Sequence, residues 1–499
     1  MLNQARYFLP GMTSDNCQKI TSWNFNIYTM WNGNGARSRN SHVDSQSVDK
    51  EEENRAEWKE RGSSSFSRDF SGASASTSRC SKHGRKQKGL MARYLFRNAQ
   101  ILDAERGDYL ADGSVLVEGD RILEVGGADV YASEAQSFDL AGLTLLPGLI
   151  DAHVHVTAVT ADLARLAEWS PAYVTARAAR VLEGMLRRGF TTVRDVGGAD
   201  YGLAQAIEEG YLEGPRLLFG GKALSQTGGH GDVRGPGRQA YDRCHYCPSL
   251  GVICDGVEEV RKAAREEIRR GASHLKLMLS GGVASPTDRV DSVQFSREEI
   301  RAAVEEAEAA NLYVAGHAYT SRAINRGLEC GVRSIEHGNL MDESSLPLFQ
   351  ERGALYVPTL VTYSALATRG REFGLPEHSH RKVFEVLDAG LHALELAHRA
   401  HIPIVYGTDL LGGMHEEQLS EFTLRRQVQP PADILRSATT VAARLLRLEG
   451  QVGVVAPGAS ADLLVVDGDP LQDIGVLTDP QHRLKLVMAR GRMTVNHLG

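Results

Sequence analysis

The feature that most constrains the fold is a pattern repeated from residue 144 onward. A short apolar run is followed by a polar or glycine-rich loop and then by a stretch of helical periodicity. The apolar runs are TLLPGLIDAHVH, TTVRDVGG, RLLFGGKAL, HLKLMLSGG, YVAGHAY, RSIEHGN, ALYVPTL and IPIVYGTD. Eight strands alternating with helices predict an α/β fold, a (β/α)8 TIM-like barrel with its reactive groups at the C-terminal strand ends. A doubly wound open sheet is the main alternative.

The stretches between the runs have the signals of helices. DGVEEVRKAAREEIRRGA and SREEIRAAVEEAEAAN show a period of about 3.6 residues, and the second opens with Ser296 and Glu299 at the spacing of a capping box. We therefore expect a helix to begin directly after Ser296.

Composition narrows the class of partner. A net charge of -7 and a pI near 6.2 give no electrostatic reason to expect a nucleic acid or an acidic membrane as partner. Six cysteines in 499 residues are too few for a disulfide scaffold, and no apolar run is long enough for a membrane span or a signal peptide. We expect a cytoplasmic homo-oligomer that acts on a small-molecule substrate.

The chain changes character near residue 90. The preceding stretch SSSFSRDFSGASASTSRCSKHGRKQKG is rich in serine, arginine and glycine, and its hydrophobic residues are too scattered to form a core face. Residues 1–90 are therefore predicted to be a disordered extension, either an upstream artefact of start-codon assignment or a regulatory or targeting tail. A protein beginning at Met91 should keep its activity and thermal stability.

Four histidines and an aspartate end the predicted strands. His153 and His155 end the first run, His317 the fifth, His337 the sixth and Asp409 the eighth. Residues two apart in a strand face the same side, so His153 and His155 can present two imidazoles to one metal ion. Such a pair alone is more often two polar residues at a strand end. All five residues at one barrel mouth, however, form the imidazole and carboxylate set that Zn²⁺ prefers.

Lys276 stands in the middle of the fourth apolar run. An ammonium group in a buried strand costs several kcal/mol unless it is paired, neutralised or chemically altered. A neutral amine in a metal-rich site can add carbon dioxide and become a carbamate, whose two oxygens could bridge two metal ions. The alternative is a lysine paired with a carboxylate such as Asp195 or Glu336.

These motifs together resemble those of a known family. LPGLIDAHVH, the lysine in KLMLSGGVASPTD, GHAYT, SIEHGN and YGTD are similar to the amidohydrolase superfamily, in its branch of binuclear-metal prolidase-like dipeptidases and carboxypeptidases. That branch is also similar to imidazolonepropionase-like enzymes and to amidohydrolases that cleave ochratoxin A. The resemblance implies a barrel over residues 149–450 and a small β-sandwich built from residues 91–148 and 451–499.

The resemblance also implies a ligand set and a chemistry. His153 and His155 would bind the buried metal ion, His317 and His337 the outer one, and carbamylated Lys276 would bridge the two divalent ions, which are expected to be Zn²⁺. A metal-bridging hydroxide would attack the carbonyl. Asp409 would pass the water's proton to the leaving nitrogen, unless it is a metal ligand only. His230 in QTGGHGD and Tyr319 would hydrogen-bond the scissile group, although each alone is more often an ordinary polar residue.

The expected substrate is the amide bond of a dipeptide, such as an Xaa-Pro dipeptide, or of an N-acyl amino acid. A free carboxylate on such a substrate needs a cation near the metal pair. The candidates at the barrel mouth are Arg234, Arg238, Arg289 and Arg322. A cyclic amide, or a toxin amide such as ochratoxin A, which is a phenylalanine amide with a free carboxylate, is the second hypothesis. A non-catalytic barrel is the third, and the intact ligand set argues against it.

Overall fold

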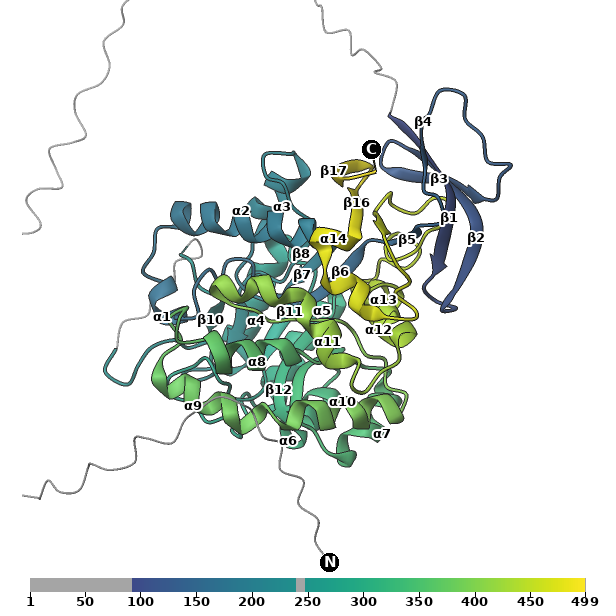
Figure 1. Cartoon of the computed structure of the whole chain (residues 1–499). Coiled ribbons are helices and arrows are strands. Elements are labelled where there is room, and N and C mark those ends of the chain that lie inside the picture. The colour runs from purple at the N-terminus through teal and green to yellow at the C-terminus, as the bar shows by residue number, and fades with distance from the viewer. Residues whose placement is uncertain (1–91, 239–246, 499) are drawn as a thin grey trace, which may run out of the picture. The chain divides into compact units, whose positions relative to one another are not determined.

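The computed structural model describes residues 92–238 and 247–498, which belong to the compact unit Lys86–Gly499 (Figure 1). The predicted extension over residues 1–90 lies outside the described residues and stays a prediction. The described chain contains two kinds of sheet. One is a mixed sheet made from its two ends, and the others are parallel sheets that contain His153, His317 and His337.

The mixed sheet joins the beginning and the end of the described chain. Its order is β17-β16-β15-β5-β1-β2-β3, with β4 also paired to β1. In Figure 1 these are the purple strands and the yellow strands near the C-terminus. The strands are β1 (Arg93–Asp103), β2 (Asp108–Glu118), β3 (Arg121–Gly126), β4 (Gln136–Asp139), β5 (Thr144–Pro147), β15 (Leu463–Val466), β16 (Leu484–Ala489) and β17 (Arg492–Asn496).

Alternating apolar side chains build the core of this mixed sheet. Phe96, Val115 and Val117 are fully buried and share one cluster with Leu145 and Leu463, so residues from both ends pack on each other. The strands connect as one sheet, and its further division into a β-sandwich stays a prediction.

Parallel strands form two further sheets. Their orders are β6-β7-β8 and β10-β9-β11-β12-β13-β14, and every pair within them is parallel. The strands are β6 (Leu149–Val154), β7 (Phe190–Asp195), β8 (Arg216–Phe219), β9 (Ala223–Ser225), β10 (Gly251–Ile253), β11 (Leu275–Met278), β12 (Val314–Thr320), β13 (Ser334–Leu340) and β14 (Leu355–Val357). Buried parallel strands flanked by helices place the chain in the α/β class, as predicted.

Two of the predicted runs divide between sheets. The first run supplies β5 to the mixed sheet and β6 to a parallel sheet. The third run breaks between β8 and β9 at Gly221, whose φ is +70°, and an added Cβ there would lie 2.0 Å from Glu267 Oε2. Only glycine fits such a left-handed, crowded position, so the run bends there and cannot continue as one strand.

The eighth run pairs through single bonds instead of a full ladder. Tyr356 in β14 bridges to Ile404, and the Val405 N–H donates to the Tyr356 carbonyl at 2.8 Å. On its other side, the Ala152 N–H of β6 donates to the Tyr406 carbonyl at 2.9 Å. The segment before Asp409 therefore lies between β14 and β6.

Helices follow most of the parallel strands. Helix α5 (Arg297–Ala309) begins after Ser296 with the predicted capping box, which is confirmed. The others are α1 (Leu163–Leu166), α2 (Pro171–Arg187), α3 (Tyr201–Glu208), α4 (Gly256–Arg269), α6 (Ser321–Glu329), α7 (Leu346–Arg352), α8 (Leu360–Arg369), α9 (Glu377–Val386), α10 (Ala389–Arg399), α11 (Ser420–Arg425), α12 (Pro431–Ser437), α13 (Thr440–Leu446) and α14 (Pro480–Arg483), with short 3-10 helices at Glu343–Ser345, Gly412–Leu419 and Ile474–Thr478.

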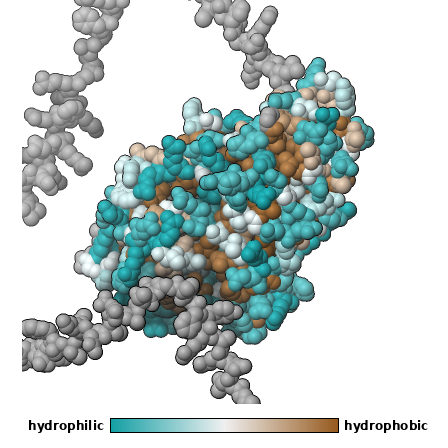
Figure 2. All heavy atoms as spheres, in the orientation of Figure 1, coloured by the Kyte–Doolittle hydropathy of each residue, from teal (hydrophilic) through white to brown (hydrophobic). Residues whose placement is uncertain are grey.

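The surface of the described unit is mixed in hydropathy. On the face that Figure 2 draws, hydrophilic side chains cover much of the molecule and hydrophobic ones show between them. In the part of the chain that the structure describes, no helix combines the length and apolar character needed to cross a membrane.

Candidate metal and active site

Five of the six predicted ligand residues lie in or directly after parallel strands, and the sixth, Asp409, follows an extended segment. His153 lies in β6 with His155 just beyond it, Lys276 lies in β11, His317 in β12 and His337 in β13. Asp409 follows the segment held between β14 and β6. Because the carboxyl ends of neighbouring parallel strands lie at the same edge, residues far apart in sequence meet there.

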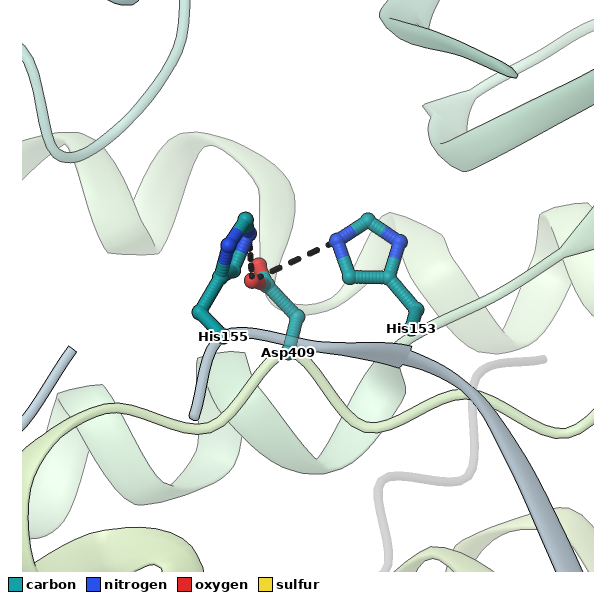
Figure 3. A group of neighbouring side chains, drawn as sticks. All are labelled: His153, His155 and Asp409. Atoms are coloured by element: carbon teal, nitrogen blue, oxygen red, sulfur yellow. Dashed lines mark ion pairs between the residues drawn. The ribbon is translucent and has the colours of Figure 1, made fainter. Parts of the chain in front are cut away.

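His153, His155 and Asp409 form the tightest group. Figure 3 shows the Asp409 carboxylate between the two imidazoles that β6 presents. Asp409 Oδ1 lies 3.4 Å from His153 Nε2 and 3.3 Å from His155 Nε2. One ligand atom from each of the three side chains lies within 4.8 Å of the others, a spacing that can hold a metal ion. The HxH spacing therefore places two imidazoles on one side of β6, as predicted.

His317 and His337 extend this group. The His337 ring centroid lies 4.8 Å from that of His153 and 4.6 Å from that of His317. His337 and Asp409 both have left-handed backbones, with φ of 73° and 53°. This conformation is costly for residues with a side chain and persists where surrounding structure imposes it, which is common at functional sites.

Outer partners fix which ring nitrogen faces the group. His153 Nδ1 donates to Glu336 Oε2 at 2.7 Å, and His155 Nδ1 donates to the Gly197 carbonyl at 2.7 Å. His317 Nε2 donates to the Gly281 carbonyl at 3.1 Å. In each ring the other nitrogen then keeps its lone pair. Such outer hydrogen bonds orient imidazoles that bind metals.

A buried ion pair supports His153. Arg194 Nη2 donates to both carboxylate oxygens of Glu336 at 2.9 Å, and neither side chain is exposed. The sequence reasoning treated Glu336 only as a possible partner of Lys276 and did not consider Arg194. Both are charged residues inside buried strands, which is the pattern that drew attention to Lys276. The same pattern could therefore have predicted that Arg194 and Glu336 form a buried pair.

Lys276 forms no ion pair with Asp195 or Glu336, the carboxylates that the alternative explanation named. It is 1% exposed, and its Nζ makes no hydrogen bond with any described residue. Glu336 instead pairs with Arg194, and the Asp195 carboxylate accepts the N–H groups of Val156, Gly197 and Ala199. Burial lowers the pKa of Lys276 to about 8.

The charge states of His317, His337 and Asp409 suit metal binding. Burial lowers the pKa of His317 and His337 well below the usual value, so both rings are neutral near pH 7. Burial alone would raise the pKa of Asp409, but the neighbouring His153 and His155 hold it well below its usual range. Neutral imidazoles and an ionised carboxylate are the forms that bind metal ions.

A pocket opens beside this group. Its lining includes His155, His230, His317, Tyr319 and Asp409, together with the apolar side chains of Leu163, Val233, Leu250, Met278, Val283, Leu366 and Leu411. Three of the six predicted ligand residues and two of the four residues predicted to bind substrate, His230 and Tyr319, thus line one pocket with apolar walls.

His230 and Tyr319 both contact the ring of His317. The His230 ring stacks on His317 with centroids 4.2 Å apart, and burial lowers the pKa of His230 to about 4. The Tyr363 hydroxyl donates to the Tyr319 hydroxyl at 3.1 Å, which leaves the proton of Tyr319 available to the pocket. Burial raises the pKa of Tyr319, so its hydroxyl stays protonated. Tyr363, which the sequence reasoning missed, carries no pattern that distinguishes it from a core tyrosine.

The arginines lie apart from these residues. No arginine or lysine is among the described residues that line the pocket. The Arg289 side chain is 82% exposed and pairs with Asp291, and Arg322 donates to the Asp291 carbonyl. Arg238 lies 3.8 Å from Glu168. Arg234 is 20% exposed, pairs with Asp232 and adjoins the lining residue Val233.

The residues present fit divalent metal ions. His153 Nε2 and Lys276 Nζ are buried polar atoms without a hydrogen-bond partner among the described residues. An unpaired buried polar atom costs about 1–3 kcal/mol, and a bound cation or its ligands would remove that cost. Imidazoles with inward lone pairs and a carboxylate supply the donor set of a zinc-type site.

Comparison with known proteins identifies the family of the chain. Residues 144–494 match the amidohydrolase family. Ochratoxinase of Aspergillus niger is 34% identical over 405 residues, which cover 77% of this chain and 83% of that protein. A prolidase crystallised with N-methylphosphonate-L-proline is 49% identical with a TM-score of 0.79, covering 81% of this chain and all of that one. A Xaa-Pro dipeptidase with bound methionine is 29% identical with a TM-score of 0.73, over 81% of this chain and all of that one. The chain therefore belongs to the amidohydrolase family, as a metal-dependent hydrolase of C–N bonds.

Proposed function

We propose that the protein hydrolyses the amide bond of dipeptides or N-acyl amino acids. The observation that carries this proposal is a cluster of four imidazoles and the Asp409 carboxylate, of which His155, His317 and Asp409 line a pocket with apolar walls. The buried amine of Lys276, which has no hydrogen-bond partner among the described residues, adds to it. The names of the relatives support the substrate class, because prolidase, Xaa-Pro dipeptidase and ochratoxinase all indicate hydrolysis next to an amino acid.

Two divalent metal ions, most simply Zn²⁺, are the proposed cofactors. The residues that would hold them are His153, His155, Lys276, His317, His337 and Asp409. Lys276 would first be carbamylated: its neutral amine forms a bond to the carbon of CO₂ and loses one proton, which leaves a carbamate with one negative charge. Its burial, and the lack of a hydrogen-bond partner for its Nζ in the part of the chain that the structure describes, support this step.

The side chains then divide the work of hydrolysis. Bound divalent ions supply a polarised carbonyl and a water of lowered pKa. Asp409, an ionised carboxylate at the centre of the group, accepts the proton of the attacking water and transfers it to the leaving nitrogen. Tyr319 donates its free hydroxyl proton to the scissile group, and His230 fixes the orientation of that group from the opposite wall.

The apolar walls indicate a hydrophobic side chain near the scissile bond. Among the arginines, Arg234 is the best placed to meet a substrate carboxylate, because it adjoins Val233 in the pocket wall. Ochratoxin A, with its phenylalanine amide and free carboxylate, satisfies the same requirements. A toxin amide is therefore the second candidate substrate, favoured by the likeness to ochratoxinase.

We also infer that the parallel strands close into a (β/α)8 barrel over residues 149–450. The hydrogen bonds that tie the eighth run to both β14 and β6 support closure, as does the Ser273 N–H, which donates to the Phe219 carbonyl of β8 at 2.8 Å beside β11. The mixed sheet of residues 91–148 and 451–499 would form the β-sandwich domain. The homo-oligomer and the cytoplasmic location remain proposals of the same kind.

A substrate panel tests the function. The zinc-loaded protein is assayed with Xaa-Pro and other dipeptides, N-acyl amino acids, ochratoxin A and cyclic amides, and each carboxylate substrate is paired with its C-terminal amide. We expect amidated substrates to be turned over at least about tenfold more slowly, the effect of losing roughly 1.4 kcal/mol. Equal rates for both forms would remove the carboxylate requirement and favour a cyclic amide.

A further inference from the structure

One lysine outside the metal site ties a distant helix to the loop after β11. Lys382 lies on α9, and its Nζ donates to the carbonyls of Gly282 and Ser285, both at 2.9 Å. The same ammonium lies 3.2 Å from Asp288 Oδ1. Three contacts to one short loop satisfy all three donors of the ammonium group.

The loop in turn holds His230. The Ser285 hydroxyl donates to Asp288 Oδ1 and lies 2.9 Å from His230 Nδ1. Gln294 makes a second connection, because its Nε2 donates to Asp288 Oδ2 at 3.0 Å and its Oε1 accepts the His230 N–H at 2.9 Å. Ser285, Asp288 and Gln294 are nearly or fully buried, so these bonds are shielded from water.

The third contact of His230 is steric. A Cβ added to Gly282 would lie 2.1 Å from the His230 ring, so the ring rests directly on the backbone that Lys382 binds. On its other side the ring stacks on His317. His230 lines the pocket, and with Nδ1 turned to Ser285 its Nε2 has no hydrogen-bond partner among the described residues.

We propose that Lys382 is a positioning residue: through Asp288, Ser285 and the Gly282 backbone it holds the His230 ring in the orientation that presents Nε2 to the substrate. This inference rests on the proposed substrate-facing role of His230. The competing explanation is that Lys382 only anchors the loop and stabilises the fold. The two explanations differ in whether the effect of Lys382 passes through His230.

A double-mutant cycle separates them. Lys382→Met keeps the length of the side chain and removes its donors, Lys382→Arg restores a cation, and Arg381→Met removes an exposed cation from the same helix as a control. On the zinc-loaded protein we expect Lys382→Met to lower kcat by about tenfold or more with unchanged metal content, Lys382→Arg to recover part of it, and Arg381→Met to have no effect. In a His230→Gln background, adding Lys382→Met should lower kcat by less than a further factor of about two.

A spectrum gives a readout that needs no substrate. In protein with ¹⁵N-labelled histidine, the His230 ring resonances are identified by their loss in His230→Gln. They should shift in Lys382→Met, return toward the wild-type position in Lys382→Arg and stay in place in Arg381→Met. If Lys382→Met does not fold, Ser285→Ala takes its place in the same cycle. An unshifted His230 spectrum, or an equal loss of kcat with and without His230, would overturn the proposal. A failed substrate assignment would leave the spectrum untouched.

Discussion

The two sides of the pocket are held in place by different means. On the metal side, His153, His317 and His337 lie on strands, and each ring is at most 3% exposed. On the proposed substrate side, His230 lies on a loop and contacts Ser285, which belongs to the segment bound by Lys382 of α9, some 150 residues further along the chain. Strand geometry fixes the first set, and long-range side-chain bonds fix the second.

This difference has a consequence for mutation. Under the proposed function, a metal-side residue takes part in the reaction directly, so its replacement should remove activity. A substrate-side residue is one of several contacts, so its replacement should change the rate or the apparent affinity by smaller factors. Equal losses of activity on the two sides would remove this distinction.

The largest effect is expected at Asp409. Asp409→Asn keeps the size and one oxygen ligand but cannot accept a proton, so kcat should fall about 10³-fold, within the range of general acid–base contributions. Steady-state kinetics on the zinc-loaded variant measure this, with metal content as the control. A variant that keeps kcat within tenfold and both metal ions would show that Asp409 is a ligand only.

A smaller loss is expected at Glu336, one contact further out. Glu336→Gln removes the charge that accepts the His153 Nδ1 proton and leaves Arg194 buried without its partner. Metal affinity should fall about 10- to 100-fold, as for other outer partners of metal-binding histidines. Competition with a chelator measures the affinity. An unchanged affinity would show that Glu336 does not support metal binding.

The pH dependence of reconstitution follows from Lys276. Its pKa is lowered to about 8, so the neutral amine that reacts with CO₂ predominates above pH 8 and decreases about tenfold per pH unit below it. After chelation, and at a fixed partial pressure of CO₂ that keeps dissolved CO₂ constant, recovery of activity with Zn²⁺ should slow about five- to sixfold between pH 8 and pH 7. A recovery rate that is flat over this range would argue against a carbamylation step.

The smallest effects are expected at the arginines. Arg289→Ala should change kcat/KM less than about twofold, because its exposed side chain pairs with Asp291 outside the pocket lining. Arg234→Ala should raise KM for free-carboxylate substrates up to about tenfold and leave amidated ones unchanged. The reverse order of the two effects would assign the carboxylate contact to Arg289.

The sequence predicted the grouping of the four histidines with Asp409 and named His230 and Tyr319 through the family resemblance, but it did not predict how His230 is held in place. Strand ends meet at one edge, so the order of the apolar runs was enough to bring His153, His317, His337 and Asp409 together. The break at Gly221 and the division of the first run were not predicted, because apolar periodicity does not reveal which sheet a strand joins. The role of Lys382 depends on loop conformation, which leaves no periodic signal in the sequence.

The central claim is that Lys276 completes a site for two metal ions, and metal stoichiometry tests it most directly. Metal analysis after reconstitution with Zn²⁺ and bicarbonate should give two ions per wild-type chain. Lys276→Ala should lose most bound metal and activity, and small added carboxylates should restore part of both. A Lys276→Ala protein that binds two ions per chain and retains full turnover would contradict the account.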